Sequence, residues 1–132
     1  MKYAWIVLLA GVAPAVSAPA VAQARPVANR CGSVTLVART GERPAPVCLR
    51  RGATLRVVTE PSPRQPWSLP ASSDRSMLRC VSRRLPEGAA VATCRARRAG
   101  TVTVATQTAP FAGDPHGPPE YLWQVTVTIS RR

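Results

Sequence analysis

The residues that could do acid–base or metal chemistry lie in one short stretch near the end of the chain. The segment FAGDPHGPPEYLW holds the single histidine, His116, with Asp114 two residues before it and Glu120 four residues after it. An imidazole flanked by carboxylates could act as a general base or bind a metal ion. A zinc site needs three or four ligands, however, and this stretch offers at most three, with prolines stiffening the spacer.

A nucleophile that His116 could activate is also missing from the sequence pattern. No serine occurs in the ten residues before it, the four cysteines form an even set, and Lys2 is the single lysine. The glycines and prolines around His116 predict a turn-rich surface loop. We therefore predict no catalytic residue, no metal site, no cofactor and no small-molecule substrate. An enzyme built around His116 is the least favoured of the functions considered.

The start of the chain predicts export. The segment MKYAWIVLLAGVAPAVSAPAVAQA has a basic start at Lys2, an apolar run too short to span a bilayer, and then small residues. We predict a secretory signal peptide over residues 1–24 and a single domain over residues 25–132. The protein is then secreted to the extracellular space, with no transmembrane anchor after cleavage. The cleavage site could follow any of three alanines: Ala18, Ala22 or Ala24.

Charge and cysteine content give further information on the class of protein. Once Lys2 is removed with the signal peptide, 17 arginines remain against six acidic residues, a formal net charge of +11. Such a charge attracts anionic polymers, although the use of arginine in place of lysine is also what a GC-rich genome produces. Four cysteines in an exported chain of this length predict two disulfides, which stiffen a core of modest size.

Apolar and polar residues alternate along most of the chain, which indicates β-strands with one buried face. The pattern is clearest in YLWQVTVTI, residues 121–129, and no window of similar length has the spacing of an amphipathic helix. We predict an all-β, immunoglobulin-like β-sandwich of about seven strands, with a small Greek-key barrel as the alternative. The strands are expected at residues 31–38, 46–50, 53–59, 65–69, 77–85, 89–98 with 101–108, and 120–130.

Residues 77–98 predict a β-hairpin that turns at the tripeptide PEG. Pairing the two arms about this turn places Cys80 directly opposite Cys94, and opposed residues on neighbouring strands come close enough for a disulfide. Cys31 is then left to pair with Cys48. Two other pairings of the four cysteines remain possible.

Three stretches between residues 60 and 111 keep only parts of the loop motifs of a known family, while the framework around them is kept better. The segment EPSPRQPW keeps a proline, a hydroxyl residue and a tryptophan of the motif Asn-Pro-Thr-Thr-Gly-Tyr, which is followed two residues on by Trp. PEGAA keeps one glycine of a glycine-rich loop, and APF keeps the proline of Arg-Pro-Trp. Together with the phrase RRAGTVTV, these stretches make residues 54–129 resemble the chagasin-like family of cysteine-protease inhibitors, which are immunoglobulin-like sandwiches. The chain also resembles short exported actinobacterial proteins of the same scaffold.

The resemblance implies that three loops lie at one end of the sandwich and enter the cleft of papain-like proteases. Glycine and tyrosine of the first motif are replaced by Arg64 and Gln65, so we expect this loop to have another shape. Ala109 and Phe111 stand where the third motif has Arg and Trp. The candidate binding residues are those at matching positions: Pro61, Ser62, Trp67, Gly88, Pro110 and Phe111.

Arginines concentrate in the predicted hairpin. Glu87 is the single acidic residue among them, and a run of like charge is either a solvated outer face or a docking face for an anionic envelope polymer. No aromatic residue occurs between Trp67 and Phe111, so this face lacks the stacking platform that single-stranded nucleic acid needs. The candidate anion-binding residues are Arg79, Arg83, Arg84, Arg95, Arg97 and Arg98.

These observations predict an exported, non-enzymatic binding or structural module of the cell envelope or secretome. Its expected partner is an unidentified protein or an anionic envelope polymer. The alternative is a diverged chagasin-like cysteine-protease inhibitor, because a fold by itself does not determine a function.

Overall fold

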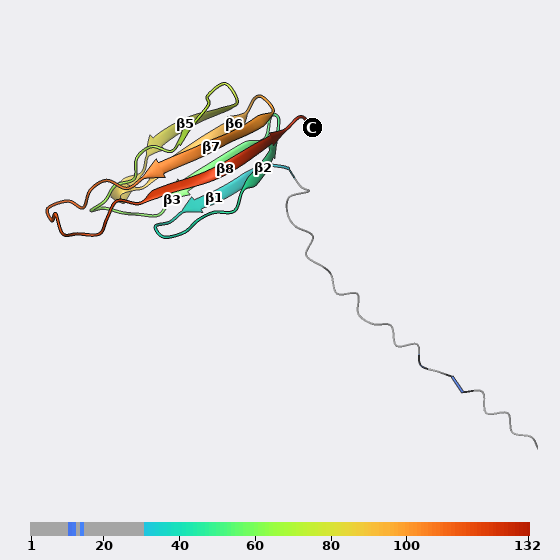
Figure 1. Cartoon of the computed structure of the whole chain (residues 1–132), viewed down its shortest axis with the longest axis horizontal. Helices are drawn as coiled ribbons and strands as arrows, with labels where there is room; N and C mark the ends of the chain where they lie inside the picture. The colour runs from blue at the N-terminus through green and yellow to red at the C-terminus, as the bar shows by residue number, and fades with distance from the viewer. Residues whose placement is uncertain (1–10, 13, 15–30) are drawn as a thin grey trace, which may run out of the picture.

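The computed structural model describes residues 31–132 together with 11, 12 and 14 (Figure 1). The predicted cleavage sites and, apart from those three positions, the predicted signal peptide lie outside the described residues. Within the described part, no helix has the length and apolar character needed to cross a membrane.

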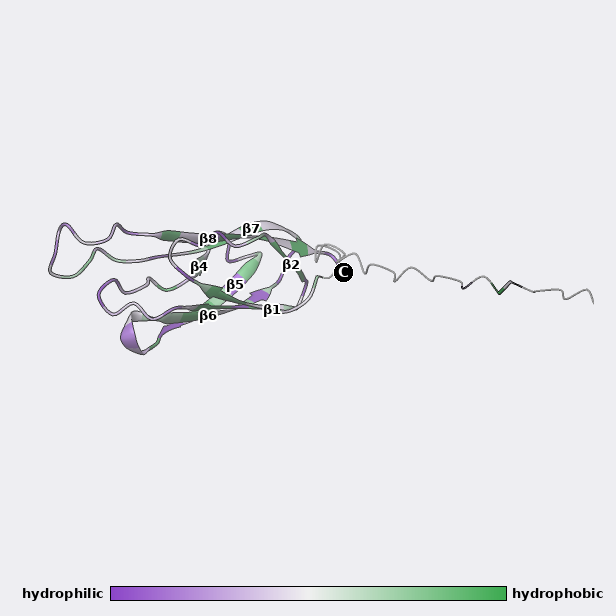
Figure 2. Cartoon of the chain, turned by 90° about the horizontal axis from the view of Figure 1, so that it is seen from below, coloured by the Kyte–Doolittle hydropathy of each residue, from purple (hydrophilic) through white to green (hydrophobic). Residues whose placement is uncertain are grey.

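Within residues 31–132, eight strands form two four-stranded sheets that pack face to face. One sheet has the order β1-β3-β6-β5 and the other β2-β8-β7-β4. Figure 2 shows the two layers edge-on, with loops extending at one end. The predicted all-β sandwich is thus confirmed. The strands are β1 (Val34–Ala38), β2 (Val47–Arg50), β3 (Thr54–Thr59), β4 (Ala71–Ser72), β5 (Leu78–Arg84), β6 (Ala90–Ala96), β7 (Gly100–Gln107) and β8 (Leu122–Ser130).

The alternating residues form the core between the sheets. Along β8 every second side chain is buried, from Trp123 to Ile129, while the residues between them are exposed. Leu55 and Val57 of β3 are fully buried, and Arg56 between them is exposed. Each buried branched side chain contributes about 1.5–3 kcal/mol of hydrophobic free energy relative to an exposed one. The period-two pattern therefore determines which face of each strand packs inward.

The hairpin of β5 and β6 has the predicted register. Cys80 pairs with Cys94 across the two strands, their Cα atoms 3.9 Å apart, and the two form a disulfide. The second disulfide joins Cys31 to Cys48, with Cα atoms 4.6 Å apart. Both predicted bridges are confirmed. One bridge lies within the first sheet, and the other ties the segment before β1 to β2 of the second sheet.

Two predicted strand ranges are wrong. Residues 65–69 form no strand, because a proline at Pro66 and others nearby remove backbone donors, and Trp67 makes only an isolated bridge with Thr108. The short strand β4 follows instead. Residues 89–98 and 101–108, predicted as one run, are two strands in different sheets, since the chain bends after β6 and crosses to the second sheet as β7.

The strand directions determine at which end of the sandwich each connecting loop lies. β1 runs parallel to β3, and β6 runs antiparallel to both β3 and β5. The loops at residues 39–46, 60–66, 85–89 and 108–121 therefore lie at one end, called the loop end here. The turns at residues 51–53, 73–77 and 97–99 and the C-terminus lie at the other, called the turn end (Figure 1).

Candidate functional site

The first loop, residues 60–66, is held in place by hydrogen bonds at its first residue, Glu60. The backbone amide of Glu60 donates to the carbonyl oxygen of Ala38 at 2.9 Å. Its carboxylate accepts hydrogen bonds from the amide and hydroxyl of Thr40, at 2.9 and 3.1 Å. Pro61 and Pro63 then restrict the backbone, because each proline fixes its own φ angle. The loop thus leaves the sheet in one direction with little freedom to bend.

The second loop, residues 85–89, is hydrogen-bonded along the first. The amide of Ser62 donates to the carbonyl oxygen of Glu87 at 2.8 Å, and the amide of Trp67 donates to that of Gly88 at 2.9 Å. Glu87 and Gly88 both have left-handed backbone conformations, with φ of 61° and 74°. A Cβ added to Gly88 would lie 2.8 Å from the carbonyl carbon of Ser62. Only glycine therefore allows the two loops to pack this closely.

The third loop, residues 108–121, is hydrogen-bonded to the other side of the first. The amide of Ala109 donates to the carbonyl oxygen of Pro66, and that of Ala112 to the carbonyl oxygen of Arg64, both at 2.9 Å. The side chain of Gln65 adds two bonds from Nε2, to the carbonyl oxygens of Pro118 at 3.0 Å and Pro119 at 3.3 Å. The first loop is therefore the middle element of a three-loop surface.

Arg64 and Phe111 meet at the tip of this surface. The guanidinium carbon of Arg64 lies 5.5 Å from the centre of the Phe111 ring, within the range of a cation–π contact. Gly117 packs against the same ring, which leaves Phe111 half-buried. Arg64 does not have a left-handed backbone. The loop thus adopts a conformation that a residue other than glycine can take, and the arginine covers part of an apolar tip.

The candidate binding residues of the sequence analysis fall into two groups. Pro61 and Pro110 are exposed, and Ser62, Gly88 and Phe111 are half-buried, all on the three-loop surface. Trp67 differs, because its side chain is fully buried in the core beneath the loops. Its expected direct role in a binding loop does not fit this position.

The segment around His116 is an ordinary turn. The amide of His116 donates to a carboxylate oxygen of Asp114 at 2.8 Å, and the amide of Gly117 donates to the Asp114 carbonyl at 3.1 Å. Glu120 accepts a hydrogen bond from the side-chain amide of Gln107 at 2.8 Å. Within residues 31–132, no three histidine, cysteine or acidic side chains gather as metal ligands would. The contacts of His116 and Asp114 are therefore those of a turn.

Comparison with solved structures supports the scaffold. The chain is similar in fold to amebosin, known from a solution structure, with a TM-score of 0.50 and 10% identity over 74% of this chain and 100% of that one. The cysteine protease inhibitor EhICP2 from Entamoeba histolytica aligns with a TM-score of 0.47 and 10% identity, over 73% and 96% of the two chains. No family model and no curated protein matches the chain.

The similarity to amebosin is one of fold. The immunoglobulin-like scaffold implied by the sequence resemblance is thereby confirmed. At 10% identity the likeness carries no information on which residues bind a partner.

The structure separates the six candidate arginines. Arg79, Arg83 and Arg95 point outward from β5 and β6, on the exposed face of the first sheet. Arg84 has the opposite parity and lies at the loop end, where it donates to the carbonyl oxygen of Trp67 at 3.4 Å. Arg97 lies just beyond β6, at the turn end.

Arg98, also at the turn end, is engaged within the chain. It donates to the hydroxyl of Ser76 at 3.0 Å, and its guanidinium lies 4.0 Å from the carboxylate of Asp74. The carboxylate of Asp74 also accepts hydrogen bonds from the hydroxyl of Ser76 at 2.6 Å and from its amide at 2.8 Å. These Ser76 bonds lower the pKa of Asp74 below its usual value, with Arg98 as a smaller cause.

Proposed function

We propose that the three-loop surface formed by residues 60–66, 85–89 and 108–121 binds the active-site cleft of a papain-like cysteine protease and thereby inhibits it, as a diverged member of the chagasin-like scaffold. The observation that carries the proposal is the joining of three loops, distant in sequence, into one surface. Ser62, Arg64 and Pro66 of the first loop are backbone-bonded to the second or third loop. A surface formed before binding avoids the ordering cost that flexible loops would incur.

The side chains of the three-loop surface suit an inhibitor that fills the protease cleft and takes no part in a chemical reaction. Its exposed residues include Pro61, Pro63 and Pro110, which have little conformational freedom to lose on binding. Phe111 supplies an aromatic side chain, the type of residue that anchors many interfaces. The function therefore requires shape and burial, and no catalytic group.

Two replacements set the expected strength of binding. Arg64 stands where the family motif has glycine, and it places a charged side chain over Phe111. Phe111 itself buries less surface than the family's tryptophan would. We expect inhibition constants in about the micromolar range, which corresponds to about 8 kcal/mol of binding free energy.

The proposal includes export. Disulfides persist in oxidising compartments outside the cytosol, and this chain forms two of them. Together with the predicted signal peptide, they favour a protein that meets its protease outside the cell. The wider prediction of a cell-envelope binding or structural module is compatible with this location, but it assigns no role to the three joined loops.

A competition experiment tests the proposal. The purified protein, with both disulfides formed, is titrated into papain and into papain whose cleft is blocked by an irreversible peptide-like inhibitor. We expect binding to the free enzyme and none to the blocked enzyme. Equal binding to both would place the contact outside the cleft and overturn the proposal, and so would the absence of binding to either.

A further inference from the structure

Charge is distributed unevenly between the two ends of the sandwich. Of the six acidic residues, only Asp74 lies at the turn end. The other five occupy loops at the loop end: Glu42, Glu60, Glu87, Asp114 and Glu120. Acidic residues at the loop end offset its arginines, whereas the arginines of the turn end are largely uncompensated. The field of the molecule is therefore strongest at the turn end.

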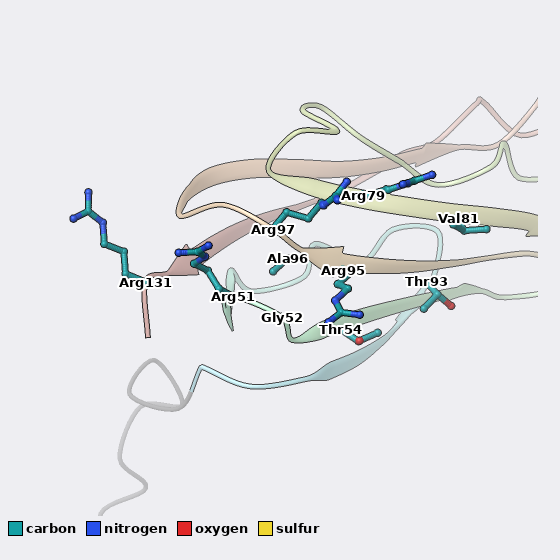
Figure 3. Close-up of a pocket in the computed structure, with 10 residues that line it drawn as sticks. All are labelled: Arg51, Gly52, Thr54, Arg79, Val81, Thr93, Arg95, Ala96, Arg97 and Arg131. Atoms are coloured by element: carbon teal, nitrogen blue, oxygen red, sulfur yellow. The ribbon is translucent and has the colours of Figure 1, made fainter.

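A hollow on the first sheet, near the turn end, is lined by arginines from four separate segments. It is lined by Arg51, Arg79, Arg95, Arg97 and Arg131, and no acidic residue lines it (Figure 3). These arginines come from the β2–β3 turn, β5, β6 with the residues just after it, and the C-terminus. Three of the five, Arg79, Arg95 and Arg97, belong to the arginine-rich segment predicted as a hairpin from the sequence.

Two of these arginines occupy directly opposed positions on neighbouring strands. Arg79 of β5 is the register partner of Arg95 of β6. The neighbouring pair Cys80–Cys94 has the close spacing of a non-hydrogen-bonded pair, so the arginines form the wider type, with Cα atoms about 5.5 Å apart. Like charges directly opposite on neighbouring strands destabilise a sheet. Among residues 31–132 the one ion pair is Arg98–Asp74, so this repulsion is not relieved within the described part of the chain.

The residues around Arg79 and Arg95 limit the kind of anion that could bind there. Beside the arginines the hollow is lined by small or short side chains, Thr54, Val81 and Thr93, and no aromatic residue lines it. Val81 is 70% exposed on this face. Figure 3 shows Arg95 turned toward Thr54 and Arg131 pointing away from the other arginines. The site offers guanidinium donors and no surface on which a nucleobase could stack.

We propose that this hollow binds a linear, non-aromatic phosphate polymer. Guanidinium groups bind phosphate oxygens through paired hydrogen bonds. A tetrahedral phosphate presents oxygens in several directions, and successive phosphates of a chain can reach arginines that point different ways, as Arg79 and Arg95 do (Figure 3), whereas the two oxygens of a carboxylate lie in one plane. Arginines from four segments along an open hollow suit a chain of phosphates more than a single ion.

The site is independent of the proposed protease-binding surface. Arg79 lies near the start of β5 and Arg95 near the end of β6, both toward the turn end, whereas the three joined loops lie at the loop end. A protein held on a polyanion by its turn end would still present its loops. The arginine hollow would therefore act as an anchor, and it does not rest on the protease proposal.

Binding of inorganic polyphosphate tests the site. The double variant Arg79→Ser/Arg95→Ser is compared with Arg39→Ser/Arg43→Ser, which removes the same charge from exposed positions at the loop end. We expect the first variant to bind at least about tenfold more weakly at low salt, with the slope of log affinity against log salt reduced by about two contacts. We expect the control variant to lose less than about twofold. Equal losses in the two variants, or no loss in the first, would overturn the proposal.

Two further ligands test the chemistry of the polymer. Polyglutamate and single-stranded DNA of matched charge are titrated under the same conditions, and thermal unfolding confirms that each variant is folded. We expect polyphosphate to bind more tightly than either. If polyglutamate binds as tightly, tetrahedral phosphate is not what the site recognises. If DNA binds more tightly, a non-aromatic ligand is the wrong class.

Discussion

The carbonyl group of Ser62 packs directly against the α-carbon of Gly88, which leaves no room for a side chain between the first and second loops. Gly88→Ala would strain a backbone with φ of 74° and also push the loops apart. The left-handed conformation alone costs alanine about 1–2 kcal/mol. We predict a loss of about 2 kcal/mol or more in the free energy of unfolding, measured by urea denaturation, together with weaker protease binding.

Gly41→Ala is the matched control for this change. Gly41 has nearly the same φ, 78°, but nothing lies within 4 Å of a Cβ placed there. It should therefore show the conformational cost without the loop displacement, and leave protease binding unchanged. If both variants lose equal stability and neither affects binding, the close packing of the two loops is unimportant.

Arg64 is predicted to weaken protease binding by covering Phe111. Arg64→Ala removes the cation–π contact and exposes the ring, while the bond from the Ala112 amide to the backbone carbonyl at position 64 remains. We predict an inhibition constant about threefold to tenfold lower, measured against papain. Arg39→Ala, which removes an equal charge elsewhere on the loop end, should have little effect. Weaker inhibition by the Arg64 variant would show that the arginine itself contacts the protease.

The Cys80–Cys94 bridge should contribute substantially to stability. It closes a loop with a sequence separation of 14 residues, for which the chain-entropy model gives about 3 kcal/mol. We predict that Cys80→Ala/Cys94→Ala lowers the free energy of unfolding by about that amount, while the far-ultraviolet circular dichroism of the strands persists at room temperature. A loss below about 1 kcal/mol would mean that the unfolded chain gains little freedom without the bridge.

Asp74 should make stability depend on pH in the acidic range. Its pKa is lowered in the folded protein, mainly by the hydrogen bonds from Ser76. The folded state therefore favours the carboxylate, and this stabilisation is present above the unfolded pKa and lost as the pH falls through the folded one. We predict that Asp74→Ala lowers the melting temperature at pH 7, and that the difference from the parent disappears at strongly acidic pH. A difference that persists there would point to a cause other than ionisation.

Local patterns were enough to predict most of the fold. The alternation in residues 121–129 predicted β8 and its buried face, because a strand has a period of two whatever its partners are. The hairpin register followed from one turn and two cysteines, since both arms are adjacent in sequence. The strand predicted at residues 65–69 is wrong, because a buried apolar residue does not by itself distinguish a strand from a loop. Trp67 is apolar and buried, but it packs from a proline-rich loop and not from a strand.

The candidate sites depended on contacts between distant residues and were predicted only in part. The resemblance indicated which loops would meet, but the bonds of Gln65 to Pro118 and Pro119 join positions more than fifty residues apart. Arg51 and Arg131 reach the arginine hollow from segments far from the hairpin. A linear count of charge finds neighbours in sequence and misses such residues.

The most direct test of the proposed function is the inhibition of papain and of a cathepsin L-type protease by the unmodified protein, with both disulfides formed. We predict competitive inhibition by the three-loop surface, with an inhibition constant in about the micromolar range, weakened by Gly88→Ala and unaffected by Arg79→Ser/Arg95→Ser. Failure to inhibit either protease at about a hundred times that concentration, or inhibition that is not competitive with substrate, would contradict it.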